Sequence, residues 1–443
     1  MDQVIFEGIR CFPERHSCPL KPVTLLVGEN SSGKTTFLAL TRIAWDIAGG
    51  DLSQDIFNEE PFLLGSYDQI ASFRGGKAGR AKSFTIGVQV SLRQRHNTSG
   101  LFSESALTTA KFVSAGSESK LDEWRFESGN FKILAKSSQR SSQVDITITT
   151  PSGSRKIGER PIIGSWLNFT RVLNELRFIL SREFRAPDEK RDQQTLIMSE
   201  NELRELQNIS FQLSRSLGQR PYAFAPIRTR PQRTYDPLKE VPKPEGSHVP
   251  MVLAKTLLEE SNGRSKLKEI LASFGKTSGL FNSLEVKRKG HKESDPFQIG
   301  VKTMGPTFNL VDVGYGVSQV LPIIVDVVQN SENSTFLLQQ PEVHLHPRAQ
   351  AELGSFLATL AKEQNKRFVI ETHSDHLIDR IRMDIRDKKF ISPEDVVILY
   401  FEKTSGGVNI HELNFDEFGN ITNPPSTYRQ FFLEEERRML GVE

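Results

Sequence analysis

The stretch that decides the fold is PVTLLVGENSSGKTTFLAL, residues 22–40. Its first part, Val23–Val27, is a short apolar run that is typical of a buried strand. A turn rich in glycine and serine follows, and apolar residues then recur at helical spacing from Phe37 to Ala44. Residues 28–35 match the pattern GxxxxGK(S/T) and lie where that pattern requires, after a strand and before a helix. The stretch therefore predicts a phosphate-binding loop.

Each part of this loop has a physical role in holding a nucleoside triphosphate. Glycines allow backbone N–H groups to turn inward around phosphate oxygens, and the helix N-terminus adds the positive end of its dipole. Lys34 supplies a positive charge to the β- and γ-phosphates, and the Thr35 hydroxyl is placed to bind Mg²⁺. The expected nucleotide-binding residues in this loop are Gly28, Asn30, Ser31, Ser32, Gly33, Lys34, Thr35 and Thr36.

Three later segments carry small, polar or histidine residues where a ligand site needs them. Val311–Ile324 has a glycine–serine turn, Gly314 to Ser318, that opens an apolar helix whose N-terminus is able to face an anion. Thr335–Pro347 is an apolar strand followed by polar residues, and Phe368–Ile381 is a strand that ends in Thr-His-Ser before a helix. This arrangement fits the rule that α/β sheets bind ligands beyond the carboxyl ends of their strands.

The order of these segments resembles the head domains of the ABC/SMC-type ATPases. It resembles more closely the stand-alone bacterial AAA-type ATPases related to the overcoming-lysogenization-defect (OLD) family and to the Septu and PARIS phage-defence ATPases. The resemblance covers Val4–Thr41 and Val311–Ile381 well. It implies an α/β fold, namely an ABC/SMC-type P-loop ATPase head with an antiparallel β subdomain and a helical insert lobe, and it implies ATP and Mg²⁺ as ligands.

The resemblance also implies how copies of the chain assemble. Residues 28–36 correspond to the Walker A loop and residues 314–319 to the signature turn. In those families ATP lies between two heads. Gly316 and Ser318 of one subunit would then face the phosphates held by Lys34 of the other. A homodimer or a larger homo-oligomer is therefore expected from the resemblance.

The sequence departs from the family pattern after the Walker B strand, which spans residues 336–342. The usual acidic pair is replaced by Gln339 and Gln340, and Glu342 follows two residues later. The Gln339 amide oxygen can accept a hydrogen bond from a magnesium-bound water, whereas Gln340 cannot take a proton as a general base. Either Glu342 serves as the base, or hydrolysis is slow and nucleotide binding itself is the signal; we favour slow turnover with Glu342 as the base. By the resemblance, His373 is the switch histidine that senses the γ-phosphate. The expected catalytic set is Lys34, Glu342, Gln340 and His373, and the expected metal-binding residues are Thr35 and Gln339.

Composition narrows the class of protein. The 57 Lys and Arg residues against 55 Asp and Glu leave a formal charge of +2, which excludes a globally basic wrapper of nucleic acid but permits a local basic patch. The two cysteines, Cys11 and Cys18, cannot form a disulfide framework. No export signal is recognised, and no apolar run approaches the ~18 residues of a membrane span. We expect a cytoplasmic protein with no membrane partner.

The sequence suggests four consecutive segments. Residues 1–180 are expected to form an N-terminal ATPase lobe with the Walker A loop and a β subdomain, and residues 181–310 a helical insert lobe. Residues 311–390 are expected to form a C-terminal ATPase lobe with the signature turn, the Walker B strand and the switch histidine. Residues 391–443 are expected to add a strand, a hairpin and a helix.

Local patterns predict the elements inside these segments. Alternating apolar and polar residues between Ser83 and Thr150 indicate antiparallel strands. Helical spacing favours a helix within Pro187–Leu217 and another at Arg348–Glu363. Pro221–Pro250 is rich in proline and reads as an ordered loop or linker, and Arg367–Glu371 reads as a buried strand.

Two basic clusters raise the hypothesis of contact with DNA. Arginine interleaved with aromatic residues can hold phosphates and stack on bases. The alternatives are a solvated loop for the first cluster, and for the second a structural set that bonds carbonyls or a partner head. The residues concerned are Arg74, Lys77 and Arg80 in the first cluster and Arg228, Arg230 and Arg233 in the second.

Two weaker signals remain open. His344 and His346 have the spacing of two metal ligands, but no cysteine or carboxylate set completes a zinc site, and a loop beside the subunit interface is the preferred interpretation. The glutamine of the family's Q-loop cannot be assigned from the sequence; Gln69 and Gln89 are both weak candidates.

The leading functional hypothesis is an ATP-binding, slowly hydrolysing ATPase that senses phage or DNA in bacterial defence. OLD proteins carry a nuclease domain after the ATPase, and only about 60 residues follow the helix after His373, fewer than a typical domain. The resemblance therefore implies a separately encoded effector, such as a nuclease or a toxin. The alternatives are an SMC-like DNA repair or recombination ATPase, which would bind DNA in an ATP-dependent way, and a nucleotide-locked scaffold that does not hydrolyse ATP. The ATPase subunit of a transporter is disfavoured, because no coupling segment is evident.

Overall fold

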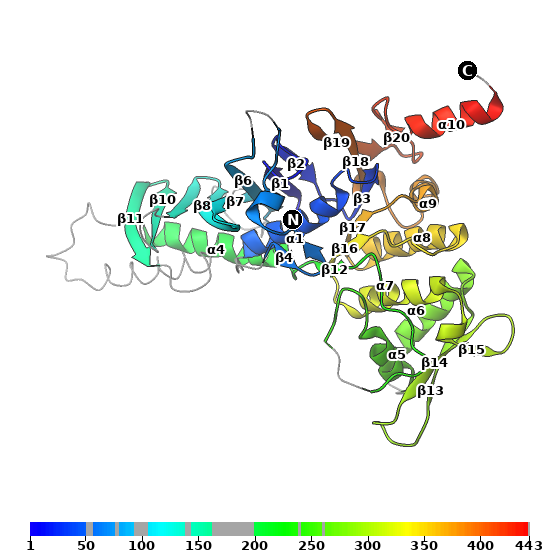
Figure 1. Cartoon of the computed structure of the whole chain (residues 1–443). Coiled ribbons are helices and arrows are strands. Elements are labelled where there is room, and N and C mark those ends of the chain that lie inside the picture. Colours follow the sequence, from blue (N-terminus) through cyan, green and yellow to red (C-terminus); the bar gives the residue numbers. More distant parts are fainter. Residues whose placement is uncertain are drawn as a thin grey trace. The chain divides into compact units, whose positions relative to one another are not determined.

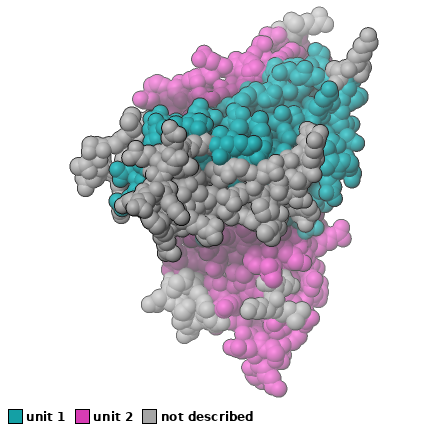
Figure 2. Space-filling view, turned by 90° about the vertical axis from the view of Figure 1, so that its left-hand side faces the viewer, with its two compact units in different colours: residues 1–20, 31–220, 403–410 teal, residues 21–30, 221–402, 411–443 magenta. Residues whose placement is uncertain are grey.

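The computed structural model describes residues 1–49, 56–75, 79–92, 105–137, 143–161, 199–237, 241–258 and 262–441. The chain forms two compact units, which Figure 2 shows in separate colours. Unit 1 consists of residues 1–20, 31–220 and 403–410, and unit 2 consists of residues 21–30, 221–402 and 411–443. This grouping differs from four consecutive segments, because a strand near the N-terminus pairs with strands from the far end of the chain.

Unit 2 is built on a seven-stranded sheet with the order β12-β16-β17-β3-β18-β19-β20. The first five of these strands run parallel to one another. Strands that are covered on both faces are nearly continuous apolar runs, and β3, β16 and β17 have this pattern. The apolar run Val23–Val27 was interpreted as a buried strand for the same reason. The strands are β12 (Tyr222–Phe224), β16 (Thr335–Gln339), β17 (Arg367–Glu371), β3 (Val23–Gly28), β18 (Val396–Thr404), β19 (Gly407–Phe415) and β20 (Ile421–Thr422).

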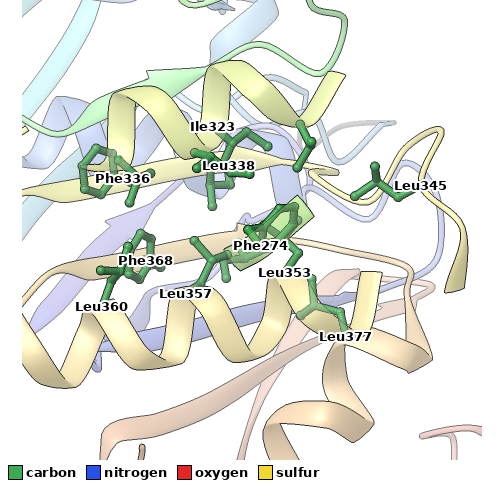
Figure 3. Close-up of a cluster of buried hydrophobic side chains, with 14 of the residues drawn as sticks. Phe274, Ile323, Phe336, Leu338, Leu345, Leu353, Leu357, Leu360, Phe368 and Leu377 are labelled. Carbon is green, nitrogen blue, oxygen red and sulfur yellow. The ribbon is translucent and has the colours of Figure 1, made fainter. Parts of the chain in front are cut away.

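Helices and strands of unit 2 meet in one apolar core. Figure 3 shows side chains of this core, with Ile323 from α7, Leu338 from β16, Leu357 from α8 and Phe368 from β17, and all four are fully buried. The helices of unit 2 are α5 (Val249–Leu258), α6 (Asn262–Ser278), α7 (Tyr315–Gln329), α8 (Pro347–Glu363), α9 (Asp375–Arg386) and α10 (Gln430–Leu440). A small antiparallel sheet packs with α5 and α6 and consists of β13 (Ser283–Arg288), β14 (Phe297–Lys302) and β15 (Thr307–Asn309).

Unit 1 contains an eight-stranded antiparallel sheet with the order β11-β10-β9-β8-β7-β6-β1-β2. The predicted antiparallel β subdomain is thereby confirmed (Figure 1). Strands such as β7 alternate between buried and partly exposed residues. The strands are β1 (Gln3–Glu7), β2 (His16–Pro19), β6 (Ser83–Ser91), β7 (Ser105–Ala115), β8 (Glu118–Ser128), β9 (Phe131–Ser137), β10 (Gln143–Thr150) and β11 (Gly153–Pro161). The sheet is larger than expected, because β1 and β2 join it through the pairing of β1 with β6.

The remaining described elements of unit 1 are α1 (Lys34–Gly49), α2 (Tyr67–Ile70), α4 (Glu200–Leu217) and the short pair β4 (Asn58–Glu59) and β5 (Phe62–Leu63). An ion pair links α1 to the residues after α4: the Arg220 guanidinium donates from Nε and Nη2 to the two carboxylate oxygens of Asp46, at 2.7 Å each. Asp46 is only 1% exposed. The same guanidinium also pairs with Glu59.

The structure differs from the sequence prediction in two segments. The helix expected within residues 187–217 is described from Glu200 onward, where Ser199 caps it, and residues 187–198 lie outside the described stretches. The proline-rich segment after residue 221 contains a strand that we did not predict, β12, which pairs in parallel with β16. Three residues are too few to show the alternation of apolar and polar residues that predicts a strand. Strand β12 forms because its backbone pairs with the edge of β16. In the described part of the chain, no helix combines the length and the apolar character that crossing a bilayer demands.

Candidate functional site

The loop between β3 and α1 combines several residues of positive φ in a short turn. Strand β3 ends at Gly28, and α1 begins at Lys34. Three residues of the loop have positive φ: Gly28 at 150°, Ser31 at 59° and Gly33 at 91°. A Cβ atom on Gly33 would lie 2.5 Å from the Phe12 ring, so neighbouring side chains exclude any larger residue there. The sequence pattern and the local geometry therefore agree.

Several polar side chains at the start of α1 are buried. Ser32, Lys34 and Thr36 are all buried, and Lys34 is 3% exposed. A lysine is rarely so buried unless an anion or another polar partner faces it. The first turn of α1 contains no acidic side chain, which leaves the positive end of the helix dipole available for a phosphate.

Arg10 is a residue of this region that the sequence analysis missed. Its guanidinium donates from Nη1 to the Thr36 hydroxyl at 3.1 Å and from Nη2 to the Leu64 carbonyl at 2.9 Å. Burial lowers the pKa of Arg10. Arg10 has a φ of 45°, an unusual left-handed conformation for an arginine, and it directly follows the strand region that packs beside the loop. No pattern in the sequence predicts that the Arg10 side chain contacts Thr36 and Leu64, because these contacts depend on the left-handed backbone conformation of Arg10.

Neither glutamine considered for the Q-loop is free to act there. The Gln69 side chain accepts a hydrogen bond from the backbone N–H of Ser66 at 2.8 Å and closes the cap of α2. Gln89 lies in the middle of β6, and its amide contacts the Ser105 hydroxyl at 3.4 Å. Both side chains therefore serve the local structure of unit 1.

The ends of β16, β17 and β3 meet at one edge of the parallel sheet. In the register, Gln339 of β16 lies opposite Glu371 of β17, and Glu371 lies opposite Leu26 of β3. Beyond these pairs, the backbone N–H of Gln340 donates to the Glu371 carbonyl at 2.8 Å, and that of Thr372 donates to the Leu26 carbonyl at 3.2 Å. The polar residues after β16 and β17 therefore lie at the edge where β3 leads into the phosphate-binding loop.

Glu342 is a buried carboxylate with one engaged oxygen. It is 7% exposed, and its Oε1 accepts a hydrogen bond of 2.7 Å from the backbone N–H of His373. Burial raises the pKa of Glu342, although the hydrogen bond from His373 opposes this effect. A carboxylate with a raised pKa holds a proton more readily, which suits a general base.

Gln339 and Gln340 differ in how they are held. Gln339 is 5% exposed, and its Nε2 has no hydrogen-bond partner among the described residues. Gln340 adopts a φ of 41°, and its backbone bonds fix the turn that leads to Glu342. The Gln339 amide is therefore available to a water or a ligand, and Gln340 shapes the loop.

The turn from Gly314 to Ser318 opens α7, as the sequence predicted. Gly314 is the N-cap of the helix, and the Ser318 hydroxyl donates to the Tyr315 carbonyl at 2.9 Å. A Cβ atom on Gly316 would lie 3.0 Å from the His344 carbonyl oxygen, so this turn packs closely on the loop that follows β16. The turn that opens α7 and the loop that follows β16 are therefore in direct contact within unit 2.

The two spaced histidines have structural roles. The His346 ring accepts a hydrogen bond from the backbone N–H of Arg348 at 3.3 Å and caps α8. The His344 ring lies against the ring of Tyr315. Within the described stretches, no group of three or more His, Cys, Asp or Glu side chains is arranged to hold a metal ion.

The first basic cluster is largely engaged with acidic groups and carbonyls of unit 1. Arg74 pairs with Glu14 at 2.6 Å, and Arg80 pairs with Asp68 at 3.2 Å. Arg80 also donates to the Ala71 carbonyl at 3.0 Å. Lys77 lies outside the described residues.

The second basic cluster divides into three different environments. Arg233 forms two hydrogen bonds with Asp312, at 2.9 and 2.5 Å, and Arg230 is exposed. Arg228 is only 2% exposed. The expectation that Arg228 contacts a nucleic acid is therefore corrected, because its side chain is enclosed within unit 2. The adjacent residues Ile227, Thr229 and Arg230 are exposed, so this burial could not be predicted from the sequence.

Comparison with known proteins identifies a family and several similar folds. The model of the AAA_21 family, described as "AAA domain, putative AbiEii toxin, Type IV TA system", matches residues 23–379. The structure of the SmcHead bound to the C-winged helix domain of ScpA is 10% identical, with a TM-score of 0.44 and coverage of 93% of this chain and 98% of that chain. An Smc head from Pyrococcus furiosus, also bound to a domain of ScpA, is 11% identical, with a TM-score of 0.39 and coverage of 98% and 99%. The SMC head from Thermotoga maritima is 11% identical, with a TM-score of 0.36 and coverage of 93% and 97%. No curated protein sequence matches this chain.

Proposed function

This chain belongs to the AAA_21 family of AAA-domain proteins, and from that membership we propose that it is an ATPase that binds ATP with Mg²⁺ and hydrolyses it slowly. The observation that carries the proposal is the loop from Gly28 to Gly33, which joins a buried strand to a helix that begins at Lys34. A loop of this conformation presents several N–H groups to a phosphate, and the helix adds its dipole.

We assign the binding of the triphosphate to this loop and to Lys34. The lysine supplies the positive charge for the β- and γ-phosphates. Mg²⁺ would be held by the Thr35 hydroxyl, with the Gln339 amide oxygen accepting a hydrogen bond from a magnesium-bound water. Gln339 fits this assignment because it is the last residue of β16, at the sheet edge where β3 leads into the phosphate-binding loop. When it is bound, the ion neutralises charge that develops on the phosphates.

We assign the role of general base to Glu342. Its Oε1 is fixed by the His373 backbone, and its Oε2 has no partner within the described stretches. The free oxygen can accept a proton from a water molecule, whereas Gln340 offers only an amide. His373 itself is proposed to sense the γ-phosphate. Slow turnover is expected, because one carboxylate replaces the usual acidic pair.

The proposed catalytic form is a dimer or a larger assembly. Gly316 and Ser318 of one copy would face the phosphates held by Lys34 of another. Exposed apolar side chains close to the signature turn support this proposal, because an apolar patch of this kind favours burial. These side chains are Phe308, Val311 and Tyr315.

The biological role that we propose is that of a cytoplasmic sensor or regulator in antiphage defence, which controls a separately encoded effector such as a nuclease or a toxin. The family description, which refers to a toxin of a type IV toxin–antitoxin system, supports this choice. An SMC-like ATPase that binds DNA and a scaffold that never hydrolyses ATP are the competing functions.

Three measurements separate these functions. Phosphate release by the wild-type protein, abolished in Lys34→Ala, supports an ATPase, whereas binding of ATP without any turnover supports the scaffold. A larger hydrodynamic size with ATP than without it supports assembly around the nucleotide. Copurification with the product of a neighbouring gene favours the defence role, whereas ATP-dependent retention of DNA without such a partner favours the repair role.

A further inference from the structure

The hairpin that β13 and β14 form in unit 2 carries a run of basic residues. The two strands pair in antiparallel register, and the loop between them spans residues 289–296 (Figure 1). The segment from Lys287 to Lys292 reads KRKGHK, so four of its six residues are Lys or Arg. The side chains of Lys287, Lys289 and Lys292 are exposed.

The positive charges of this hairpin are not neutralised by neighbouring carboxylates. The side chains of Lys287, Lys289 and Lys292 form no ion pair within the described stretches. The Asp295 carboxylate accepts a hydrogen bond of 2.7 Å from the backbone N–H of Lys292, so it fixes the backbone of the loop. Glu293 is exposed. The hairpin therefore presents a local excess of positive charge, although the whole chain is nearly neutral, and such an excess attracts a polyanion.

The pairing of the strands arranges further hydrogen-bond donors beside these charges. In the register, Lys287 of β13 lies opposite Gln298 of β14. Tyr235 pairs with Phe297 from the other edge of β14, and the Gln298 amide donates to the Thr234 hydroxyl at 3.4 Å. Lys287, Gln298 and Thr234 therefore form a row across three adjacent segments. Side chains of these types contact phosphate and sugar groups in complexes with nucleic acids.

The composition of this surface favours a nucleic acid over an acidic protein. None of the large apolar side chains that are exposed in the described residues belongs to residues 283–302. Interfaces between proteins are centred on aromatic and apolar side chains and are depleted in lysine. Contacts with a phosphate backbone are made instead by lysine, arginine and neutral donors. A two-stranded ribbon is also narrow enough to enter the major groove of duplex DNA.

We propose that the hairpin of residues 283–302 is a binding surface for the phosphodiester backbone of a nucleic acid, with Lys287, Lys289 and Lys292 in contact with phosphate oxygens. Such contacts do not depend on the base sequence. The proposal goes beyond the proposed ATPase function and does not depend on it, because none of these residues takes part in the proposed nucleotide site. In a sensor of the proposed kind, this surface detects the presence of a nucleic acid rather than its sequence.

The test measures fluorescence anisotropy of labelled duplex DNA with the full chain, without nucleotide, at salt concentrations between about 50 and 200 mM. We expect saturable binding by the wild-type protein, with an affinity that falls as salt rises. The triple variant Lys287→Gln, Lys289→Gln, Lys292→Gln should reduce the slope of log affinity against log salt by about 3, because each phosphate contact contributes about one. Duplex RNA and single-stranded DNA of the same length distinguish the possible sources of the backbone.

A matched control removes the same charge elsewhere in unit 2. The triple variant Lys266→Gln, Lys268→Gln, Lys276→Gln changes three exposed lysines of α6 and should keep the slope of the wild type. Glu293→Gln removes a negative charge from the loop itself and should strengthen binding. Because all these side chains are exposed, the melting temperatures of the variants should match that of the wild type.

Three results would contradict the proposal. If the wild type binds none of these nucleic acids at low salt, the lysines only protect the edge strand β13 from pairing with other chains. An equal loss of binding in the two triple variants would attribute the binding to net charge alone. Binding of poly-glutamate that is lost in the hairpin variant, while binding of DNA is unchanged, would assign the surface to an acidic protein.

Discussion

The Glu342 carboxylate is joined to the backbone N–H of His373 by a hydrogen bond of 2.7 Å. This bond connects the loop after β16 to the turn after β17, two segments that each follow a strand of the parallel sheet. One carboxylate oxygen is thereby fixed in direction, and the other, Oε2, has no partner among the described residues. A base that is oriented in this way needs no rearrangement before it accepts a proton, which is the kind of preorganisation that catalysis favours.

Replacing the proposed base should separate binding from hydrolysis. We expect Glu342→Gln to reduce ATP turnover by about 10²–10⁴-fold, because the amide cannot accept the proton of the attacking water. The affinity for ATP should stay within about threefold, since the phosphate-binding loop is unchanged. Steady-state phosphate release and equilibrium binding measure the two effects separately.

The matched control for this prediction is Glu363→Gln, which makes the same change at the exposed end of α8 and should leave turnover unchanged. Turnover by Glu342→Gln at the wild-type rate would show that another group takes the proton.

The conformation of the phosphate-binding loop should depend on Gly33. We expect Gly33→Ala to abolish ATP binding or to prevent folding of the loop, because φ is 91° and the new Cβ would lie 2.5 Å from the Phe12 ring and 2.6 Å from the Cys11 sulfur. Gly116 also has a positive φ, 69°, but a Cβ there meets nothing within 4 Å. Gly116→Ala should therefore carry only the backbone strain of about 1 kcal/mol and should leave ATP binding intact. Equal loss of binding in both variants would deny a special role to the contacts around Gly33.

The buried pair of Asp46 and Arg220 should be the most sensitive ion pair of unit 1. Arg220→Ala leaves the Asp46 carboxylate buried without its bidentate partner, so we expect the free energy of unfolding to fall by about 3 kcal/mol. Urea denaturation measures this loss. The control is Arg204→Ala, which breaks an exposed pair with Glu200 at 3.7 Å and should cost about 0.5 kcal/mol or less. A loss for Arg220→Ala as small as that of the control would contradict the account of this pair.

Acid should weaken the attachment of α4 within unit 1. Burial alone would raise the pKa of Glu202, but hydrogen bonds from Ser199 and Ser152 lower it to about 2, from an ordinary value of 4.5. Because the folded-state pKa is depressed, this carboxylate stabilises the protein above pH 4.5, and the stabilisation is lost as the pH falls towards 2. Glu202→Gln should therefore lower stability near neutrality and flatten the decline between these pH values. A wild-type decline that the substitution leaves unchanged would mean that other groups control it.

The parts of the fold that follow from local pattern were predictable, and the parts that depend on distant pairing were not. The strand Arg367–Glu371 has the predicted bounds, and the helix predicted at Arg348–Glu363 begins one residue earlier, at Pro347, since each carries its own apolar period. Strands β1 and β3 look equally apolar, yet β1 pairs with β6 and β3 lies between β17 and β18. No local signal distinguishes them, because the choice of partner is made by packing.

The same contrast holds for the site. The loop from Gly28 to Lys34 was predictable, because its chemistry and its conformation are encoded in consecutive residues. Arg10 and Arg228 were not, because an arginine in a polar segment is usually exposed and only the folded chain shows what surrounds it. Arg10 donates to Thr36 and Leu64, whereas Arg228 is buried and its side-chain donors have no partner among the described residues, and neither property follows from spacing along the sequence.

We propose that the loop before α1 binds the triphosphate of ATP through Lys34. Isothermal titration calorimetry of the wild-type protein with Mg²⁺ and ATP, beside the Lys34→Ala variant, tests it most directly. We expect saturable heat for the wild type and a loss of affinity of about tenfold or more for the variant, since a positive charge that hydrogen-bonds to phosphate is removed. Absence of heat in the wild type, or equal binding by the two proteins, would contradict it.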